Sequence, residues 1–190
     1  LHGRNGNFSR PMELLKRIPR DKWRREQTKR FNTASRLLDS GLKCNYPSKK
    51  KIAPDEKSIF YHAAQSMPHS TSGYSIRTHG LVSAVLKSGW GIKVHLRHGY
   101  PLDRSDFSGH SVQGEENIDG TTYLFNPTSS TSTNLIPYTE VFNFGSLEKY
   151  QENAVRAIMK KSEETKPAII HSASNFVVGL AGAEAAKRLG

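Results

Sequence analysis

The chain has 190 residues and a formal net charge of +11, and hydrophobic residues make up 35% of it. Its length fits roughly one domain, and the single cysteine, Cys44, excludes an internal disulfide framework and a four-cysteine zinc site. No stretch approaches the ~20 apolar residues of a membrane span, and no signal-peptide core follows the first charges. We therefore expect a soluble, cytoplasmic protein.

The positive charge is concentrated near the N-terminus. Residues 1–56 contain 15 lysines and arginines against 6 acidic residues, whereas residues 57–190 contain 13 against 11. This asymmetry predicts two parts with different roles, a basic helical arm with a linker over 1–56 and a folded domain over 57–190.

Within the arm, residues 1–11 are rich in Gly, Asn and Arg and are predicted to be disordered. A short helix is expected over 13–18, because Pro19 disfavours the helical conformation of the residue before it. Residues 42–57 contain two prolines and three consecutive lysines, which is typical of a linker.

The main helix of the arm is predicted over 21–39, with Asp21 as its N-cap and Gly41 as its C-terminal stop. Its apolar residues share one face only roughly, and basic residues cover much of the rest. Such a helix could dock on the body, lie on an anionic membrane surface, bind phosphates, or simply expose a solvated charged face.

The body alternates strands and helices. Strands are predicted over 58–64, 92–96, 121–125 and 167–171, and helices over 74–88, 147–161 and 175–189. This alternation is typical of an α/β fold, here a Rossmann-like open, mostly parallel sheet with helices on both faces. Such a sheet would normally continue with another strand after its last helix, so we expect the domain to be truncated.

Two polar loops follow predicted strands, at 65–74 and at 171–175. In open α/β sheets, ligands bind outside the carboxyl ends of the strands, near the point where the strand order reverses. Both loops lead into helix N-termini, whose free N–H groups suit phosphates. Ser72 and Gly73 would allow close backbone approach, although neither common glycine-rich fingerprint is present and an ordinary helix cap is the alternative.

Individual polar residues near these loops have both functional and structural interpretations. His171, at the end of a predicted strand, could donate to a ligand or act as an acid or base. Asn175 suits an N-cap as well as a ligand contact, and Arg77 suits a phosphate or carboxylate. His95 and His98 have no supporting carboxylate, so we expect no metal there.

Two ordered segments resemble the group-1 retaining glycosyltransferases of the GT-B type. Ser72-Gly-Tyr-Ser-Ile-Arg-Thr-His-Gly-Leu81, followed by His98-Gly-Tyr-Pro101, is similar to the first βα unit of that family. The common form there is G-G-Y-x-x-R-T-H-G-L, so Ser72 replaces a glycine. Ile169–Phe176, with the small-residue helix that follows it, is similar to the fourth strand and next helix of the family. The resemblance covers about residues 58–190 and leaves the arm outside.

The resemblance implies two Rossmann-like domains, of which this chain matches the acceptor-side one. The second domain, which binds the nucleotide-sugar and carries an E-x7-E motif, has no counterpart here. No metal is implied, because helix N-termini and cationic side chains take its place, and no cofactor is implied, because the nucleotide-sugar is a substrate. The implied donor-phosphate contacts are Ser72, Gly73, Tyr74, Arg77 and His79. The implied acceptor contacts are His171, Ser174 and Asn175, with His171 also the candidate catalytic residue.

We therefore expect an acceptor-side domain of an enzyme that moves a sugar from a nucleotide-sugar to a sugar or lipid-linked acceptor with retention. Alone, without the donor domain, it should be inactive. The alternative is a nucleic-acid- or anionic-membrane-binding module that acts through residues 1–56. Both ideas combine in a transferase held at the inner membrane face by its arm. A nucleotide-sugar epimerase would explain the α/β order but not the two matched segments.

Overall fold

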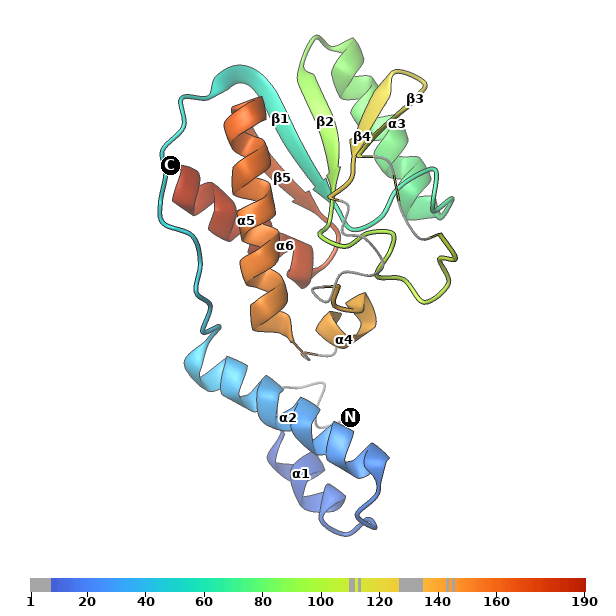
Figure 1. Ribbon diagram of the computed structural model, residues 1–190, viewed down its shortest axis with the longest axis vertical. Helices are drawn as coiled ribbons and strands as arrows, with labels where there is room; N and C mark the ends of the chain where they lie inside the picture. Colours follow the sequence, from blue (N-terminus) through green and yellow to red (C-terminus); the bar gives the residue numbers. More distant parts are fainter. Residues whose placement is uncertain (1–7, 110–111, 113, 127–134, 143, 145) are drawn as a thin grey trace.

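The structure is a computed structural model that describes residues 8–109, 112, 114–126, 135–142, 144 and 146–190. Within these residues, five strands form one sheet in the order β3-β4-β2-β1-β5 (Figure 1). The strands are β1 (Asp55–Ala63), β2 (Gly91–Leu96), β3 (Glu115–Ile118), β4 (Thr121–Leu124) and β5 (Pro167–Ala173). All neighbours run parallel except β3, which is antiparallel to β4. The predicted α/β fold with a mostly parallel sheet is confirmed.

Helices cover both faces of this sheet, as predicted. In chain order they are α1 (Ser9–Leu15), α2 (Lys22–Ser40), α3 (Gly73–Lys87), α4 (Tyr138–Phe142), α5 (Leu147–Thr165) and α6 (Phe176–Leu189). One face of the sheet packs against α3, and the opposite face packs against α5 and α6 (Figure 1).

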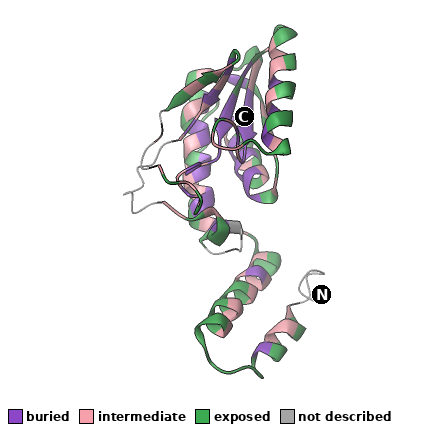
Figure 2. Cartoon of the chain, turned by 90° about the vertical axis from the view of Figure 1, so that its right-hand side faces the viewer, coloured by how far each residue is buried: buried purple, intermediate pink, exposed green. Residues whose placement is uncertain are grey.

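The alternation of side chains along β1 divides the core in two. Phe60 belongs to the cluster formed with α5 and α6, whereas Tyr61 and Ala63 belong to the cluster that includes Val82 of α3. The central strands are therefore buried on both sides, which Figure 2 shows as purple ribbon inside the body. Burial of each large apolar side chain contributes about 1.5–3 kcal/mol to the stability of the body.

Most predicted elements of the body lie within a few residues of the observed ones, but β3 and α4 were not predicted. The β3–β4 hairpin turns through two residues, Asp119 and Gly120, both at positive φ (48° and 79°). An Asp-Gly pair favours this tight turn. In β3 only four residues precede it, too few for a clear alternating pattern.

The arm differs from its prediction in its first helix. The expected helix over 13–18 was wrong in its bounds, because α1 begins at Ser9 and ends at Leu15. Pro11 lies in the first turn of α1, where the missing N–H costs no helical hydrogen bond. The disorder predicted for 1–11 was therefore wrong from Ser9 onwards, and residues 1–7 lie outside the described residues.

The second helix, α2, begins and ends as predicted. The side chain of Asp21 accepts a hydrogen bond from the backbone N–H of Arg24 at 2.7 Å, and Gly41 ends the helix with φ of 68°. The two helices of the arm form a hairpin in which the rings of Phe8 and Phe31 lie 5.8 Å apart. None of the helices in the described part of the chain is both long and apolar enough to cross a membrane.

The segment predicted as a linker lies along the body. Its backbone N–H groups at Lys50 and Ile52 donate to the carbonyl groups of Arg188 and Leu189 at the end of α6. Asn45 donates to the carboxylate of Glu152 on α5 at 2.7 Å. The chain then enters β1 at Asp55, whose backbone N–H donates to the carbonyl of Lys166 at 2.7 Å.

Candidate functional site

The candidate site lies where two neighbouring parallel strands send their chains to opposite faces of the sheet. After β1 the chain enters α3 on one face, and after β5 it enters α6 on the other. Tyr74 joins the two strand ends, because its hydroxyl donates to the carbonyl of Ala173 at 3.1 Å and accepts from the N–H of Ala64 at 3.4 Å. Loops at such a reversal point of an open sheet form the usual ligand crevice of this architecture.

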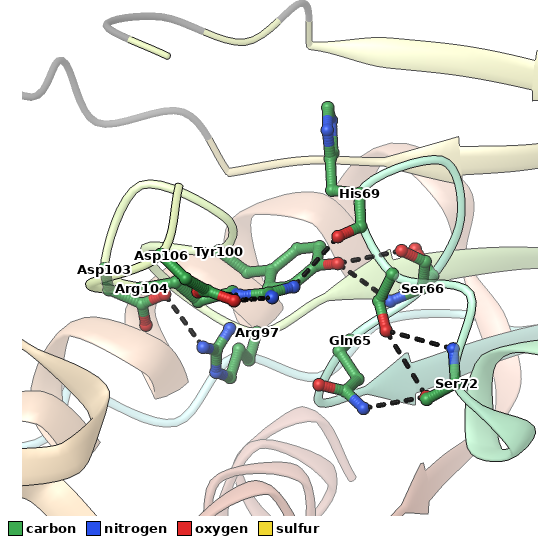
Figure 3. Close-up of polar contacts among 10 residues, drawn as sticks. Gln65, Ser66, His69, Ser72, Arg97, Tyr100, Asp103, Arg104 and Asp106 are labelled. Atoms are coloured by element: carbon green, nitrogen blue, oxygen red, sulfur yellow. Dashed lines mark hydrogen bonds and ion pairs between the residues drawn. The ribbon is translucent and has the colours of Figure 1, made fainter. Parts of the chain in front are cut away.

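The loop that follows β2 is tied to the loop that follows β1 (Figure 3). The hydroxyl of Tyr100 donates to the backbone carbonyl of Ser66 at 2.8 Å and accepts from its N–H at 3.3 Å. The guanidinium of Arg104 donates to the carbonyl of His69 at 2.9 Å. Three loops at the carboxyl edge of the sheet are therefore held in fixed positions.

A cavity of about 370 Å³ opens among these loops and α4. Its lining combines acidic, basic, amide and hydroxyl groups from four separate parts of the chain. The lining residues are Ala64, Gln65, Arg97, Asp103, Arg104, Ser105, Asp106, Tyr138, Thr139, Ser174 and Asn175.

A buried ion pair stands at the cavity. Arg97 and Asp103 have side chains that are 3% and 0% exposed, and Arg97 Nη2 donates to Asp103 Oδ1 at 2.8 Å. The guanidinium also lies 3.9 Å from the ring centre of Tyr138 and 4.9 Å from that of Tyr100. This enclosure by two aromatic rings fixes the orientation of the pair.

The ion pair leaves hydrogen-bonding capacity on both partners. Among the described residues, neither Nε nor Nη1 of Arg97 has a hydrogen-bond acceptor, and Oδ2 of Asp103 has no donor. Such buried groups are costly when left unpaired.

Burial also changes the acidity of the carboxyl group. It raises the pKa of Asp103 to about 6, although the neighbouring Arg97 guanidinium acts in the opposite direction. The pair can therefore change its net charge near pH 6, which would alter the balance of donors and acceptors that it offers.

Ser174 and Asn175, two of the predicted acceptor contacts, lie at this cavity. The side-chain oxygen of Asn175 accepts from the N–H groups of Val177 and Val178 at 3.1 and 3.4 Å, and from the hydroxyl of Tyr138 at 3.0 Å. Asn175 is thus the N-cap of α6. Ser174 has φ of 118°, a conformation that L-residues rarely adopt and that is often found at ligand sites.

His171 lies outside the cavity lining. Its strand continues to Ala173, so the prediction that His171 ends the strand was wrong. The imidazole is exposed on the sheet and stacks on the ring of Tyr61 at 4.9 Å, with the planes 11° apart. The strand runs on because β5 pairs with β1 along its whole carboxyl half.

The predicted donor-phosphate residues divide between two places. Ser72 is the N-cap of α3, and Gly73 is the first residue of that helix, where an added Cβ would meet nothing within 4 Å. Arg77 is exposed one turn further on, with its guanidinium 5.9 Å from the ring of Tyr74. These residues leave open space at a helix N-terminus.

His79 points away from that end of α3. Its Nδ1 hydrogen-bonds the hydroxyl of Tyr123 on β4 at 2.8 Å, and its Nε2 lies 3.8 Å from a carboxylate oxygen of Asp119. His79 therefore joins α3 to the β3–β4 hairpin, and the structure does not bring it together with Ser72 and Gly73.

Sequence reasoning assigned no role to the ion pair. Arg97 directly follows a predicted buried strand, and a charged residue at that position was a usable signal. Asp103 and Tyr138 carried no such signal, because their place depends on how the β2 loop and α4 fold against α6.

Comparison of the chain with protein-family models, with curated proteins and with solved structures finds no significant match.

Proposed function

We propose that this chain is the acceptor-side domain of a retaining GT-B glycosyltransferase, built on a Rossmann-like sheet. In the intact enzyme a second domain would bind the nucleotide-sugar, and this chain would hold the acceptor. One observation carries the proposal: the segments that resemble the family, far apart in sequence, begin at the carboxyl edge of β1, β2 and β5, and the last of them contributes Ser174 and Asn175 to the cavity lining.

The chemistry of the cavity supports an acceptor rich in hydroxyl groups. Its lining carries side-chain amides and hydroxyls, among them Gln65, Ser174 and Asn175, which can donate to and accept from a sugar hydroxyl. Catalysis would consist of holding an acceptor hydroxyl near the sugar carbon and stabilising the departing diphosphate. His171 is exposed on β5, so it would touch the acceptor only where the acceptor extends along that strand.

The N-terminus of α3 suits the leaving diphosphate. Its free N–H groups carry partial positive charge, and Arg77 is exposed one turn along. Retaining transfer by this arrangement needs no metal, since the helix terminus and cationic side chains would neutralise the phosphates. We extend the same proposal to the isolated chain, which should be inactive without the donor domain.

The test fills the space at this terminus in the full-length protein that contains residues 1–190. Gly73→Leu should lower transfer of labelled sugar from nucleotide-sugars by about tenfold or more, since it blocks an electrostatic contact made in the transition state. Gly80→Leu is the matched control, because Gly80 lies on the same helix and an added Cβ there also meets nothing within 4 Å. Equal activity of both variants, or no transfer by the wild-type protein, would overturn the proposal.

A further inference from the structure

The α1–α2 hairpin ends in a surface that is both apolar and basic. We call residues 14–25, which include the turn between the two helices, the hairpin tip. In it, Leu14, Ile18 and Trp23 are 43%, 36% and 52% exposed. Figure 1 shows this tip at the end of the hairpin away from the body, and Figure 2 shows the hairpin mostly green. The exposed apolar side chains are therefore not covered by the α/β body.

The charge of the hairpin tip is strongly positive. Its only acidic residue, Asp21, is engaged as the N-cap of α2. Glu13 of α1 pairs with Arg17, but no acidic side chain in the described part of the chain contacts Lys16, Arg20 or Lys22. The basic residues of the tip are Lys16, Arg17, Arg20, Lys22, Arg24 and Arg25.

We propose that the hairpin tip binds the surface of a membrane that contains anionic lipid. Trp23, Leu14 and Ile18 would enter the headgroup region, and the lysines and arginines around them would contact lipid phosphates. A nucleic acid would satisfy the charges and its bases could stack on Trp23, but it would leave the exposed Leu14 and Ile18 without a role. The observations therefore favour a membrane as the partner.

The tip lies toward the end of the molecule that holds the candidate site. Near the C-terminal end of α2, Arg36 forms a bidentate ion pair with Glu148 in the first turn of α5, with N–O distances of 2.9 and 3.0 Å. The first turn of α5 lies at the carboxyl edge of the parallel strands, since Tyr150 donates to the carbonyl of His98 just after β2. A membrane under the arm would thus face the cavity edge. That the acceptor is lipid-linked rests on the proposed function, whereas membrane binding by the tip does not.

The first experiment measures co-sedimentation of the protein with vesicles. It compares phosphatidylcholine alone with phosphatidylcholine mixed with phosphatidylserine. We expect binding to the mixed vesicles only, and we expect Lys16→Gln/Arg20→Gln/Lys22→Gln to lower the partition coefficient by about tenfold or more. The control, Lys57→Gln/Lys87→Gln/Lys93→Gln, removes three exposed charges near the amino ends of β1 and β2 and should bind as the wild type does.

The second experiment tests the apolar contact with charge held constant. Trp90→Phe leaves Trp23 as the only tryptophan, whose emission should shift to the blue on anionic vesicles and be quenched by brominated lipid. Leu14→Ser/Trp23→Ser should weaken vesicle binding. Ile76→Ser/Leu81→Ser, at exposed positions of α3, should not.

Two results would overturn the proposal. One is equal binding by the wild type and the Lys16/Arg20/Lys22 variant. The other is an unshifted Trp23 spectrum, together with salt-sensitive binding of single-stranded RNA that the same three substitutions abolish, which would assign the tip to nucleic acid. The comparison of Gly73→Leu with Gly80→Leu tests the transferase proposal independently, so the transferase proposal and the membrane proposal can each fail alone.

Discussion

The helices α5 and α2 are equally long, with 19 residues each, yet α5 buries eight residues and α2 buries one, Ala34. On α5 the apolar positions pack against β1 and α6, whereas α2, among the residues that the structure describes, packs against α1 and one end of the body. The α/β body is therefore stabilised by the burial of apolar side chains, whereas most side chains of α2 stay outside a core. Substitutions of the same type should consequently have large effects in the body and small ones in the arm.

The largest difference is expected for arginine. Arg97→Met keeps much of the volume but leaves the buried carboxylate of Asp103 without its partner, which should lower the free energy of unfolding by about 3–5 kcal/mol. Arg25→Met, at an exposed position of α2, should change it by less than about 0.5 kcal/mol. Urea unfolding at pH 7.5 measures both. Similar urea midpoints for the two variants would show that the ion pair makes no net contribution to the free energy of unfolding.

Buried histidines should give the body a pH dependence. Burial lowers the pKa of His62 to about 4 and that of His95 to about 3, whereas an unfolded histidine titrates near pH 6.5. Between these values the unfolded chain binds more protons, so stability is present above pH 6.5 and is lost as the pH falls toward 4. The raised pKa of Asp103, about 6, opposes this, because there the folded state binds more protons between pH 4 and 6.

Two substitutions separate these contributions. His95→Phe preserves the ring that stacks on Phe60 at 3.5 Å and should flatten the rise in unfolding free energy between pH 4 and 6.5. Val82→Ala should lower the whole curve without changing its slope, since it removes only buried methyl groups. Chemical unfolding at several pH values tests this, and an unchanged slope for His95→Phe would contradict the assignment.

The strands and helices of the body could be predicted from the sequence, because buried strands and amphipathic helices each leave a pattern within their own segment. The caps of α2 and α6 could also be predicted, since the side chains of Asp21 and Asn175 accept hydrogen bonds from N–H groups two or three residues away. The β3–β4 hairpin was missed although its Asp-Gly turn was visible.

The composition of the candidate site was mostly out of reach. The bond between Tyr138 and Asn175 and the contact of Tyr138 with Arg97 depend on α4 packing across the end of the sheet. Likewise, the direction of His79 is set by Tyr123 of β4, 44 residues further along the chain. Contacts of this kind follow from tertiary packing and leave no local pattern.

A smaller difference is expected for asparagine. Asn175→Ala removes the cap of α6 and the acceptor of the Tyr138 hydroxyl, and it should cost about 1 kcal/mol of unfolding free energy. Asn32→Ala, at an exposed interior position of α2, should be neutral or slightly stabilising, because alanine has the higher helix propensity. Thermal unfolding followed by circular dichroism compares the two. A destabilised Asn32→Ala with an unaffected Asn175→Ala would reverse the proposed contrast between body and arm.

The smallest effect on global stability is expected where the two regions join. Glu148 accepts from both terminal nitrogens of Arg36 and from the backbone N–H of Lys43, which lowers the pKa of its carboxyl group and fixes α2 against α5. Arg36→Gln should therefore speed amide hydrogen exchange in α2 while exchange in β1 and β5 stays unchanged, because the core does not depend on this contact. Arg156→Gln, at an exposed position of α5 eight residues after Glu148, is the control and should leave exchange in α2 as it is. If Arg36→Gln instead speeds exchange throughout the sheet, the arm is part of the cooperative unit, and the division into a buried body and an exposed arm does not hold.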